Sequence, residues 1–201
     1  MPRLAIVDCG IGNLFSIGHA LEKIGFQVKI VSAAKELQDT DAIILPGVGN
    51  FKAGSENLGA LRPEISQLIE DGVPILGICL GMQLLFERSE ESYGKGLAVL
   101  RGNVVRLSNH VKIPHMGWNT LSIVRQNELL DGISISDHFY FVHSYYARPA
   151  SKNLTVAVTD YGSKFASVIA DRNIYGTQFH PEKSSKTGES ILTNFSRIVK
   201  K

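Results

Sequence analysis

Gly77-Ile78-Cys79-Leu80-Gly81-Met82-Gln83 is the stretch of sequence that decides the fold. It follows the apolar run Val73-Pro74-Ile75-Leu76 and leads into Leu84-Leu85-Phe86, an order that predicts a buried strand, a sharp turn and a helix. The glycines two positions before and two after Cys79 carry no Cβ atom, so a tight strand-to-helix turn meets no side-chain clash there. The stretch therefore predicts a nucleophile elbow with a cysteine at its tip.

Cys79 has two possible roles in such a turn. At a helix N-terminus the dipole and the free N–H groups favour the thiolate, which is the nucleophilic form. A lone cysteine among apolar residues is, however, often only a small buried hydrophobic residue. Other parts of the chain must decide between these roles.

The far end of the chain supplies a candidate partner for Cys79. The strand-like run 173–179 ends in His180-Pro181-Glu182. In an extended chain His180 and Glu182 project to the same side, and Pro181 restricts the backbone of both itself and His180. The carboxylate can then orient the imidazole, whose other nitrogen takes a thiol proton. His-Pro-Glu alone also fits a surface turn, but the two motifs together, each after a predicted strand, favour a Cys–His–Glu triad.

The first half of the chain alternates between predicted strands and helices. Apolar or alternating runs predict strands at residues 4–8, 26–31, 42–45 and before Cys79. Helical spacing predicts a helix over residues 13–24, with Asn13 as its N-cap, and another around residues 65–69 that Gly72 ends. Strands separated by helices predict a parallel sheet covered on both faces.

The second half changes character before it ends in a helix. Strands are expected at residues 97–107, 121–124, 138–146, 155–159 and 166–170, with a hairpin turn at residues 171–173. The last apolar stripe consists of Ile191, Leu192, Phe195, Ile198 and Val199. We therefore expect one α/β domain over residues 1–201, with a largely parallel central sheet flanked by helices and an antiparallel extension. Ligands of such sheets bind at the carboxyl ends of strands, where Cys79 and His180 both fall.

Two glycine-containing loops follow predicted strands. Pro46-Gly47-Val48-Gly49-Asn50 leaves backbone N–H groups available, so Val48 or Gly49, together with the N–H of Leu80, could stabilise an oxyanion, although the loop could also be a plain turn. The loop at residues 8–13 resembles a dinucleotide-binding loop, but Phe15 stands at the third glycine position. We therefore expect no nucleotide there.

Composition excludes several classes of protein. The 201 residues are 44% hydrophobic and 20% charged, and the net charge of +2 gives no case for nucleic acid binding. No apolar run approaches the roughly 20 residues that span a bilayer. Cys9 and Cys79 make neither a disulfide framework nor a zinc site, and the histidines match no metal-binding spacing. Met1-Pro2-Arg3 leads directly into a strand, so we expect no signal peptide and a reducing, cytoplasmic location.

With these motifs in place, the chain resembles the class I (triad) glutamine amidotransferases, which have a flavodoxin-like α/β fold. Within them it is most similar to the glutaminase-subunit family of imidazole glycerol phosphate synthase. The resemblance covers essentially the whole chain. Gly77 to Gln83 and Phe179 to Glu182 are general to the class. The branch is indicated by five further segments: Pro46 to Gly49, Gly102 to Val105, Pro114 to Asn119, Phe141 to Tyr145 and Gln178 to Ser185, of which His115 to Asn119 is the most discriminating part.

The resemblance implies roles for individual residues. Cys79 matches the nucleophile, His180 the general acid and base, and Glu182 the carboxylate that orients it. The oxyanion-hole positions are Val48, Gly49 and Leu80, and the glutamine-binding positions are Gly49, Gln83, Ser144 and Tyr145. The face that docks on a partner comprises Asn13, Pro114, His115, Met116, Trp118, Tyr140 and Lys183. Relatives often carry proline at the position of Ile11, so the resemblance is weakest at that loop.

The implied reaction is hydrolysis of L-glutamine to glutamate and ammonia through a thioester on Cys79, with neither a metal nor an organic cofactor. The implied partner is a (β/α)8-barrel cyclase subunit in a heterodimer, which uses the ammonia in histidine biosynthesis. Three alternatives remain at this point. The chain could serve anthranilate, guanylate or pyridoxal phosphate synthesis, act as a stand-alone cysteine hydrolase, or be a non-catalytic redox-sensing protein in which His-Pro-Glu has no role.

Overall fold

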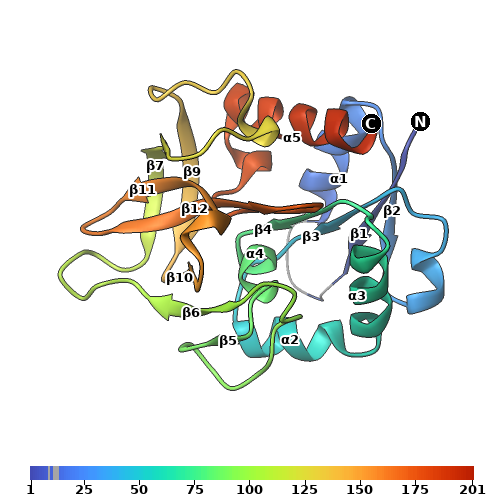
Figure 1. Ribbon diagram of the computed structural model, residues 1–201, viewed down its shortest axis with the longest axis horizontal. Helices are drawn as coiled ribbons and strands as arrows, with labels where there is room; N and C mark the ends of the chain where they lie inside the picture. The colour runs from blue at the N-terminus through green and yellow to red at the C-terminus, as the bar shows by residue number, and fades with distance from the viewer. Residues whose placement is uncertain (9, 11–13) are drawn as a thin grey trace.

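A large mixed sheet forms the centre of the molecule in the computed structural model, which describes residues 1–8, 10 and 14–201 (Figure 1). Within these residues the sheet has eight strands in the order β2-β1-β3-β4-β13-β12-β11-β8. The first five run parallel and the last three pair antiparallel. In chain order they are β1 (Arg3–Val7), β2 (Gln27–Val31), β3 (Ala42–Leu45), β4 (Ile75–Ile78), β8 (Ser122–Ile123), β11 (Thr155–Asp160), β12 (Lys164–Asp171) and β13 (Ile174–Thr177).

Helices cover both faces of the parallel part of the sheet. Figure 1 shows α1 (Leu14–Lys23) and α5 (Ser185–Val199) above it, and α2 (Phe51–Leu58), α3 (Arg62–Glu70) and α4 (Leu80–Leu84) below it. Alternate residues of β1 face opposite sides: Leu4 and Ile6 pack with α1 and α5, whereas Ala5 and Val7 pack with α2, α3 and α4. The predicted parallel sheet covered on both faces is confirmed.

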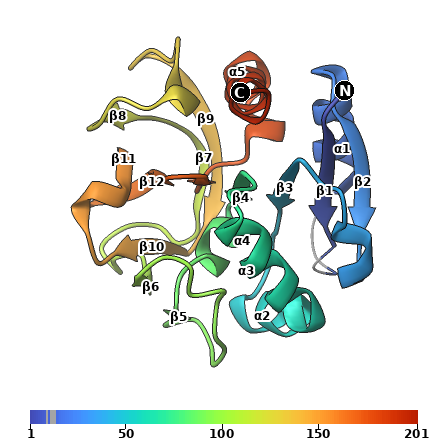
Figure 2. The ribbon, with the colours of Figure 1, turned by 45° about the vertical axis from the view of Figure 1, so that its right-hand side comes forward.

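Two smaller sheets form the extension beside the antiparallel strands (Figure 2). One contains β5 (Arg88–Ser89), β6 (Gly102–Arg106) and β10 (Tyr145–Pro149), and the other pairs β7 (His115–Thr120) with β9 (His138–His143). The short 3-10 segments are η1 (Ala34–Leu37), η2 (Gly59–Leu61), η3 (Glu128–Leu130), η4 (Lys152–Leu154) and η5 (Pro181–Lys183). Within the described ranges, no helix has both the length and the apolar composition needed to cross a membrane.

Several sequence expectations need correction. Helix α2 and strand β7 were not predicted, because α2 carries glycine and polar residues and β7 lacks a clear alternation. The strand expected over residues 97–107 begins only at Gly102, where φ is +135°. The strand expected over residues 138–146 divides at Ser144 into β9 and β10, and the carbonyl oxygen of Ser144 accepts the N–H of Leu107 in register with the pairing of β10 and β6.

Topology brings the predicted site together at one edge. Strands β3, β4 and β13 are adjacent and parallel, with Leu45 opposite Gly77 and Ile78 opposite Thr177. The segments that follow them are the glycine loop 46–50, Cys79 and the His180 segment. Pairing of β13 with β4 therefore joins two motifs that lie about a hundred residues apart in sequence, at the carboxyl edge where ligands of such sheets bind.

Candidate active site

Cys79 stands at the tip of a strained turn between β4 and α4. Its φ of 53° and ψ of −107° lie in a region that non-glycine residues rarely adopt. A Cβ atom at Gly81 would lie 1.7 Å from the carbonyl oxygen of Leu45, and one at Gly77 would lie 2.7 Å from the backbone nitrogen of Met82. Both glycines are thus required by close backbone approach, as the sequence predicted.

The helix after Cys79 is shorter than predicted. α4 ends at Leu84, and the N–H groups of Leu85 and Phe86 donate to Met82 and Gln83 in tight turns. A five-residue helix contributes little macrodipole, so the predicted effect of the helix dipole on the thiolate is small. The sulfur instead accepts a hydrogen bond from the side-chain amide of Gln178 at 3.6 Å, and the thiol lies 3.9 Å from the carbonyl oxygen of Val142.

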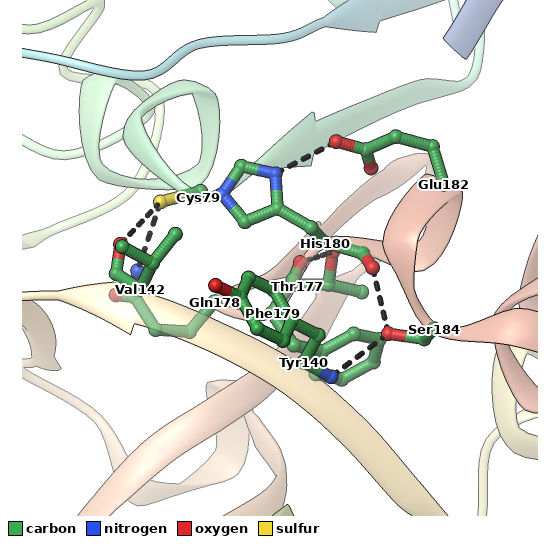
Figure 3. A network of polar contacts seen from close by, with 9 residues as sticks. All are labelled: Cys79, Tyr140, Val142, Thr177, Gln178, Phe179, His180, Glu182 and Ser184. Carbon is green, nitrogen blue, oxygen red and sulfur yellow. Dashed lines mark hydrogen bonds and ion pairs between the residues drawn. The ribbon is translucent and has the colours of Figure 1, made fainter. Parts of the chain in front are cut away.

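His180 is fixed on both sides of its backbone. Its N–H donates to the carbonyl oxygen of Tyr140 at 3.0 Å, and its own carbonyl oxygen accepts the hydroxyl of Ser184 at 2.7 Å. That hydroxyl oxygen also accepts the N–H of Tyr140 at 2.9 Å. Strand β9 and the start of α5 therefore hold the histidine together (Figure 3).

A tight turn, and not the predicted extended segment, brings Glu182 into contact with His180. The Nδ1 atom of His180 lies 2.8 Å from Oε1 of Glu182, and both side chains are almost fully buried. An extended chain was expected through this segment, but residues 181–183 form the 3-10 turn η5, which brings the carboxylate back to the ring. The Nε2 atom has no hydrogen-bond partner among the described residues and is turned toward Cys79 in Figure 3.

The charges around His180 favour imidazolium. Burial by itself lowers the pKa of His180, but a negative charge on Cys79 and the hydrogen bond to Glu182 outweigh it and raise the pKa to about 10. The arrangement therefore favours the protonated form of His180 beside the sulfur of Cys79. A thiolate beside an imidazolium is the reactive state of a cysteine nucleophile.

One predicted oxyanion donor is already engaged. The N–H of Leu80 donates to the carbonyl oxygen of Gly47 at 3.3 Å, so it does not point freely into the site. Val48 and Gly49 line the same cavity as Cys79, and the φ of Gly49 is +111°. While this hydrogen bond is present, the Leu80 N–H is not available to another acceptor in the cavity.

A cavity of about 420 Å³ opens in front of Cys79. It is lined by predicted site residues, namely Val48, Gly49, Cys79, Leu80, Gln83, Pro114, Ser144, Tyr145 and Lys183, and by Glu91, Val142 and His143. The buried side-chain amide of Gln83 donates to the carbonyl oxygen of Tyr145 at 2.9 Å and to Oε1 of Gln178 at 3.2 Å. All four predicted glutamine-binding residues thus line one cavity.

Sequence reasoning missed several residues of this site. Glu91 supplies a carboxylate, one oxygen of which accepts the N–H of Phe51 at 2.6 Å, but it lies in a polar loop without periodicity. His143 lies in the strand-like run 138–146 and was given no role of its own. Gln178 gave the clearest available signal, because an amide within the apolar run before His180 needs a buried hydrogen-bond partner.

The predicted docking residues divide between surface and interior. Met116 and Trp118 are 63% and 53% exposed, which is high for large apolar side chains. The Trp118 ring meets Tyr140 edge-on at 5.9 Å, and the Lys183 ammonium lies 6.0 Å from the centre of the Tyr140 ring. The side chain of His115, in contrast, is buried behind this face. Asn13 and Cys9 lie outside the described residues.

Comparison with known proteins agrees with this geometry. Residues 5–199 match the family described as Glutamine amidotransferase class-I. Among curated relatives, the imidazole glycerol phosphate synthase subunit HisH of Methanocaldococcus jannaschii is 48% identical over 197 residues, which cover 98% of this chain and 100% of that protein. The subunit of the same name from Bacillus subtilis is 44% identical over 205 residues, which cover 98% and 96%.

More distant solved structures share the fold. A putative GMP synthase protein from Thermoplasma acidophilum is 24% identical with a TM-score of 0.78, over 100% of this chain and 94% of that chain. PurLQS from Thermotoga maritima is 20% identical with a TM-score of 0.80, over 98% of each chain. At such identity these structures establish the fold alone, whereas the curated relatives establish the branch. The chain belongs to the class-I glutamine amidotransferase family and, within it, to the HisH subunits of imidazole glycerol phosphate synthase.

Proposed function

We propose that this chain is the glutaminase subunit of an imidazole glycerol phosphate synthase, and that residues 1–201 form a single glutaminase domain. The observation that carries the proposal is the meeting of Cys79, His180 and Glu182 at one edge of the sheet, beside a cavity of suitable size for an amino acid. The relatives of 44% and 48% identity are both HisH subunits of imidazole glycerol phosphate synthase, which favours this branch over the subunits for anthranilate, guanylate or pyridoxal phosphate synthesis. The buried His180–Glu182 pair also argues against a merely redox-sensing cysteine.

The proposed reaction is acyl transfer through Cys79. The thiolate attacks the side-chain amide carbon of glutamine, and the carbon–nitrogen bond breaks as imidazolium of His180 gives its proton to the departing ammonia. Neutral His180 then takes a proton from water, which attacks the thioester and releases glutamate and the thiolate. Glu182 holds Nδ1 of the ring throughout, which keeps Nε2 directed at the reacting atoms.

The charges at the rim of the cavity suit the two ends of free glutamine. We assign the α-ammonium group to the carboxylate of Glu91, and the α-carboxylate to the backbone around Ser144 and Tyr145 with Lys183 nearby. Gln83 and Gly49 then border the side chain that reaches Cys79. A peptide has no free ammonium or carboxylate at these positions, so this arrangement favours the free amino acid over a stand-alone peptidase substrate.

The engaged N–H of Leu80 implies low activity at rest. While it donates to Gly47, the tetrahedral oxyanion lacks one of its two expected donors. Loss of one such donor typically costs on the order of 10²–10³ in kcat. We therefore propose that a partner acts by rotating the 46–49 segment.

The proposed partner is the cyclase subunit, which docks on the face around Pro114, Met116, Trp118, Tyr140 and Lys183. Pro114 and Lys183 line the cavity as well, so a partner seated on this face would lie beside the site of ammonia release. Ammonia freed into water would be protonated or diluted, which favours direct transfer. A reducing compartment keeps the buried Cys79 thiol free, so we place the enzyme in the cytoplasm.

The test is glutamate release from L-glutamine by the full chain, alone and with a cognate cyclase subunit carrying its nucleotide ligand. We expect slow release alone, strong stimulation by the loaded cyclase, and loss of turnover in Cys79→Ala under both conditions, with thermal unfolding retained as a control for the fold. Turnover in Cys79→Ala would refute the thioester mechanism. Full activity without any response to the cyclase would refute the assigned partner.

A further inference from the structure

A chain of buried polar groups lies behind the cavity, and the proposed mechanism does not use it. His115 on β7 and His143 on β9 face each other in register, with Nδ1 of His115 3.1 Å from Nε2 of His143. The other ring nitrogen of His115 lies 3.3 Å from the side-chain nitrogen of Asn119, and that of His143 lies 2.9 Å from the carbonyl oxygen of Tyr145. Both histidine side chains are buried.

The direction of each hydrogen bond is fixed from the Asn119 end. Its side-chain oxygen accepts the N–H of Thr120 at 2.8 Å, and its side-chain nitrogen donates to the carbonyl oxygen of Asp160 at 3.1 Å, which settles the orientation of the amide. The amide nitrogen can therefore only donate to Nε2 of His115. His115 must then carry its proton on Nδ1 and donate it to Nε2 of His143.

The Tyr145 end gives the same answer independently. A carbonyl oxygen can only accept, so His143 carries its proton on Nδ1 and accepts at Nε2. All contacts are satisfied only when both rings are neutral and both are protonated on Nδ1. Burial lowers the pKa of His115 to about 4, and burial together with the nearby His115 and His180 lowers the pKa of His143 to about 3 despite its hydrogen bond to Tyr145.

The chain continues into the cavity. The Tyr145 carbonyl oxygen also accepts the side-chain amide of Gln83, whose second N–H donates to Gln178, and Gln178 donates to the sulfur of Cys79. The His115 ring is held in plane between Phe141 and Tyr161, with ring centres 4.8 Å and 4.0 Å away. A single buried path thus joins β7 to the nucleophile.

We infer that Asn119, His115 and His143 form a one-directional hydrogen-bond relay that positions the Tyr145 carbonyl and Gln83 for glutamine binding, which makes His115 and His143 positioning residues. The relay starts on β7, the strand that also carries the exposed Met116 and Trp118, so the proposed docking face and the start of the relay share one element. The role in glutamine binding rests on the proposed function, whereas the relay itself does not.

The first experiment reads the protonation of the rings without any turnover. In the full chain with nitrogen-15-labelled histidine, we expect NMR to find both His115 and His143 as the Nδ1–H tautomer, with no titration between pH 5.5 and 8. His110 and His138, which are exposed, serve as internal references. An Nε2–H tautomer or a pKa between 6 and 7 at either buried ring would overturn the relay.

The second experiment uses two variants of His115, which does not line the cavity. The amide nitrogen of asparagine takes the place of ring Nδ1, so His115→Asn keeps a donor to His143. In His115→Gln the amide lies near the place of Nε2, so that donor is lost. With the loaded cyclase present, we expect KM for glutamine within about threefold of wild type in His115→Asn. In His115→Gln we expect KM to rise about tenfold, with a smaller change in kcat.

The matched control is His110→Gln, the same substitution at an exposed histidine, for which kinetics should not change. His143 should stay protonated on Nδ1 in His115→Gln, because the Tyr145 carbonyl oxygen still accepts from that nitrogen, but the nitrogen-15 shift of its Nε2 atom should change, because this atom loses the hydrogen bond from His115. An equal effect of both His115 variants on KM, or an unchanged His143 signal in His115→Gln, would overturn the positioning role. If the wild-type chain releases no glutamate with the cyclase, the proposed function fails, and the NMR result still decides the relay.

Discussion

Gly81→Ala tests whether the close approach of two backbones builds the elbow. The added Cβ atom would lie 1.7 Å from the carbonyl oxygen of Leu45, whereas real Cβ atoms essentially never come within 3.0 Å of another atom. The difference, 3.0 − 1.7, requires the end of β3 and the start of α4 to separate by at least 1.3 Å. Both are backbone segments of the core, so no side-chain rotation relieves the clash.

The cost follows from this displacement. Overpacking of a well-packed core costs about 1–3 kcal/mol, and a backbone clash of this size belongs at the upper end, near 3 kcal/mol. For a domain of this size each kcal/mol shifts Tm by roughly 2–4 °C, so we expect Tm to fall by roughly 6–12 °C. Moving Cys79 by about 1 Å relative to His180 should also lower kcat about 100-fold.

Thermal unfolding and glutamate release with the loaded cyclase measure the two effects. The matched control is Gly18→Ala on α1, where the new Cβ would meet Ile6 and Val28 side-chain carbons at ordinary distances of 3.7 Å and 3.9 Å. That variant should be unchanged or more stable by up to about 1 kcal/mol, because alanine is the better helix former. A Gly81→Ala enzyme with Tm and kcat both like wild type would refute the account of the elbow.

Two further variants test the charges and the docking face. Glu182→Gln should lower kcat on the order of 10³-fold or more, because an amide can donate to Nδ1 and reverse the tautomer of His180. Glu182→Gln should also flatten the pH dependence of stability. Because the pKa of His180 is raised to about 10, its protonation contributes a free energy of unfolding that is complete below about pH 6.5 and is lost between pH 6.5 and pH 10. Urea unfolding across that range should therefore show a smaller loss of stability in the variant than in wild type, and equal losses would contradict the coupling of His180 to Glu182. Trp118→Glu should change the free energy of unfolding by less than about 1 kcal/mol, because the residue is 53% exposed. A binding titration should nevertheless show that its affinity for the cyclase is at least about 30-fold weaker. An unchanged affinity would remove this face from the proposed interface.

Hydrogen-bond partners explain why some residues of the site were missed. Gln178 and His143 act through contacts with residues 99 and 28 positions away, and no local pattern encodes such distances. Similarly, Glu182 reaches His180 through the turn η5, although the sequence suggested an extended segment. The proximity was foreseeable from Pro181 between two polar residues, but the backbone path was not.

The sequence alone determined the local chemistry of this protein. Two glycines around Cys79 predicted a sharp turn, apolar runs between helical spacings predicted a parallel sheet, and His-Pro-Glu after a strand-like run predicted a base with its carboxylate. These features depend on steric limits and side-chain periodicity within a few residues. Tertiary structure decided the rest: the pairing of β13 with β4, the engagement of Leu80 by Gly47, and the neutral relay behind Tyr145. Each of these depends on which distant groups become neighbours when the core is packed, and that is a property of the whole fold.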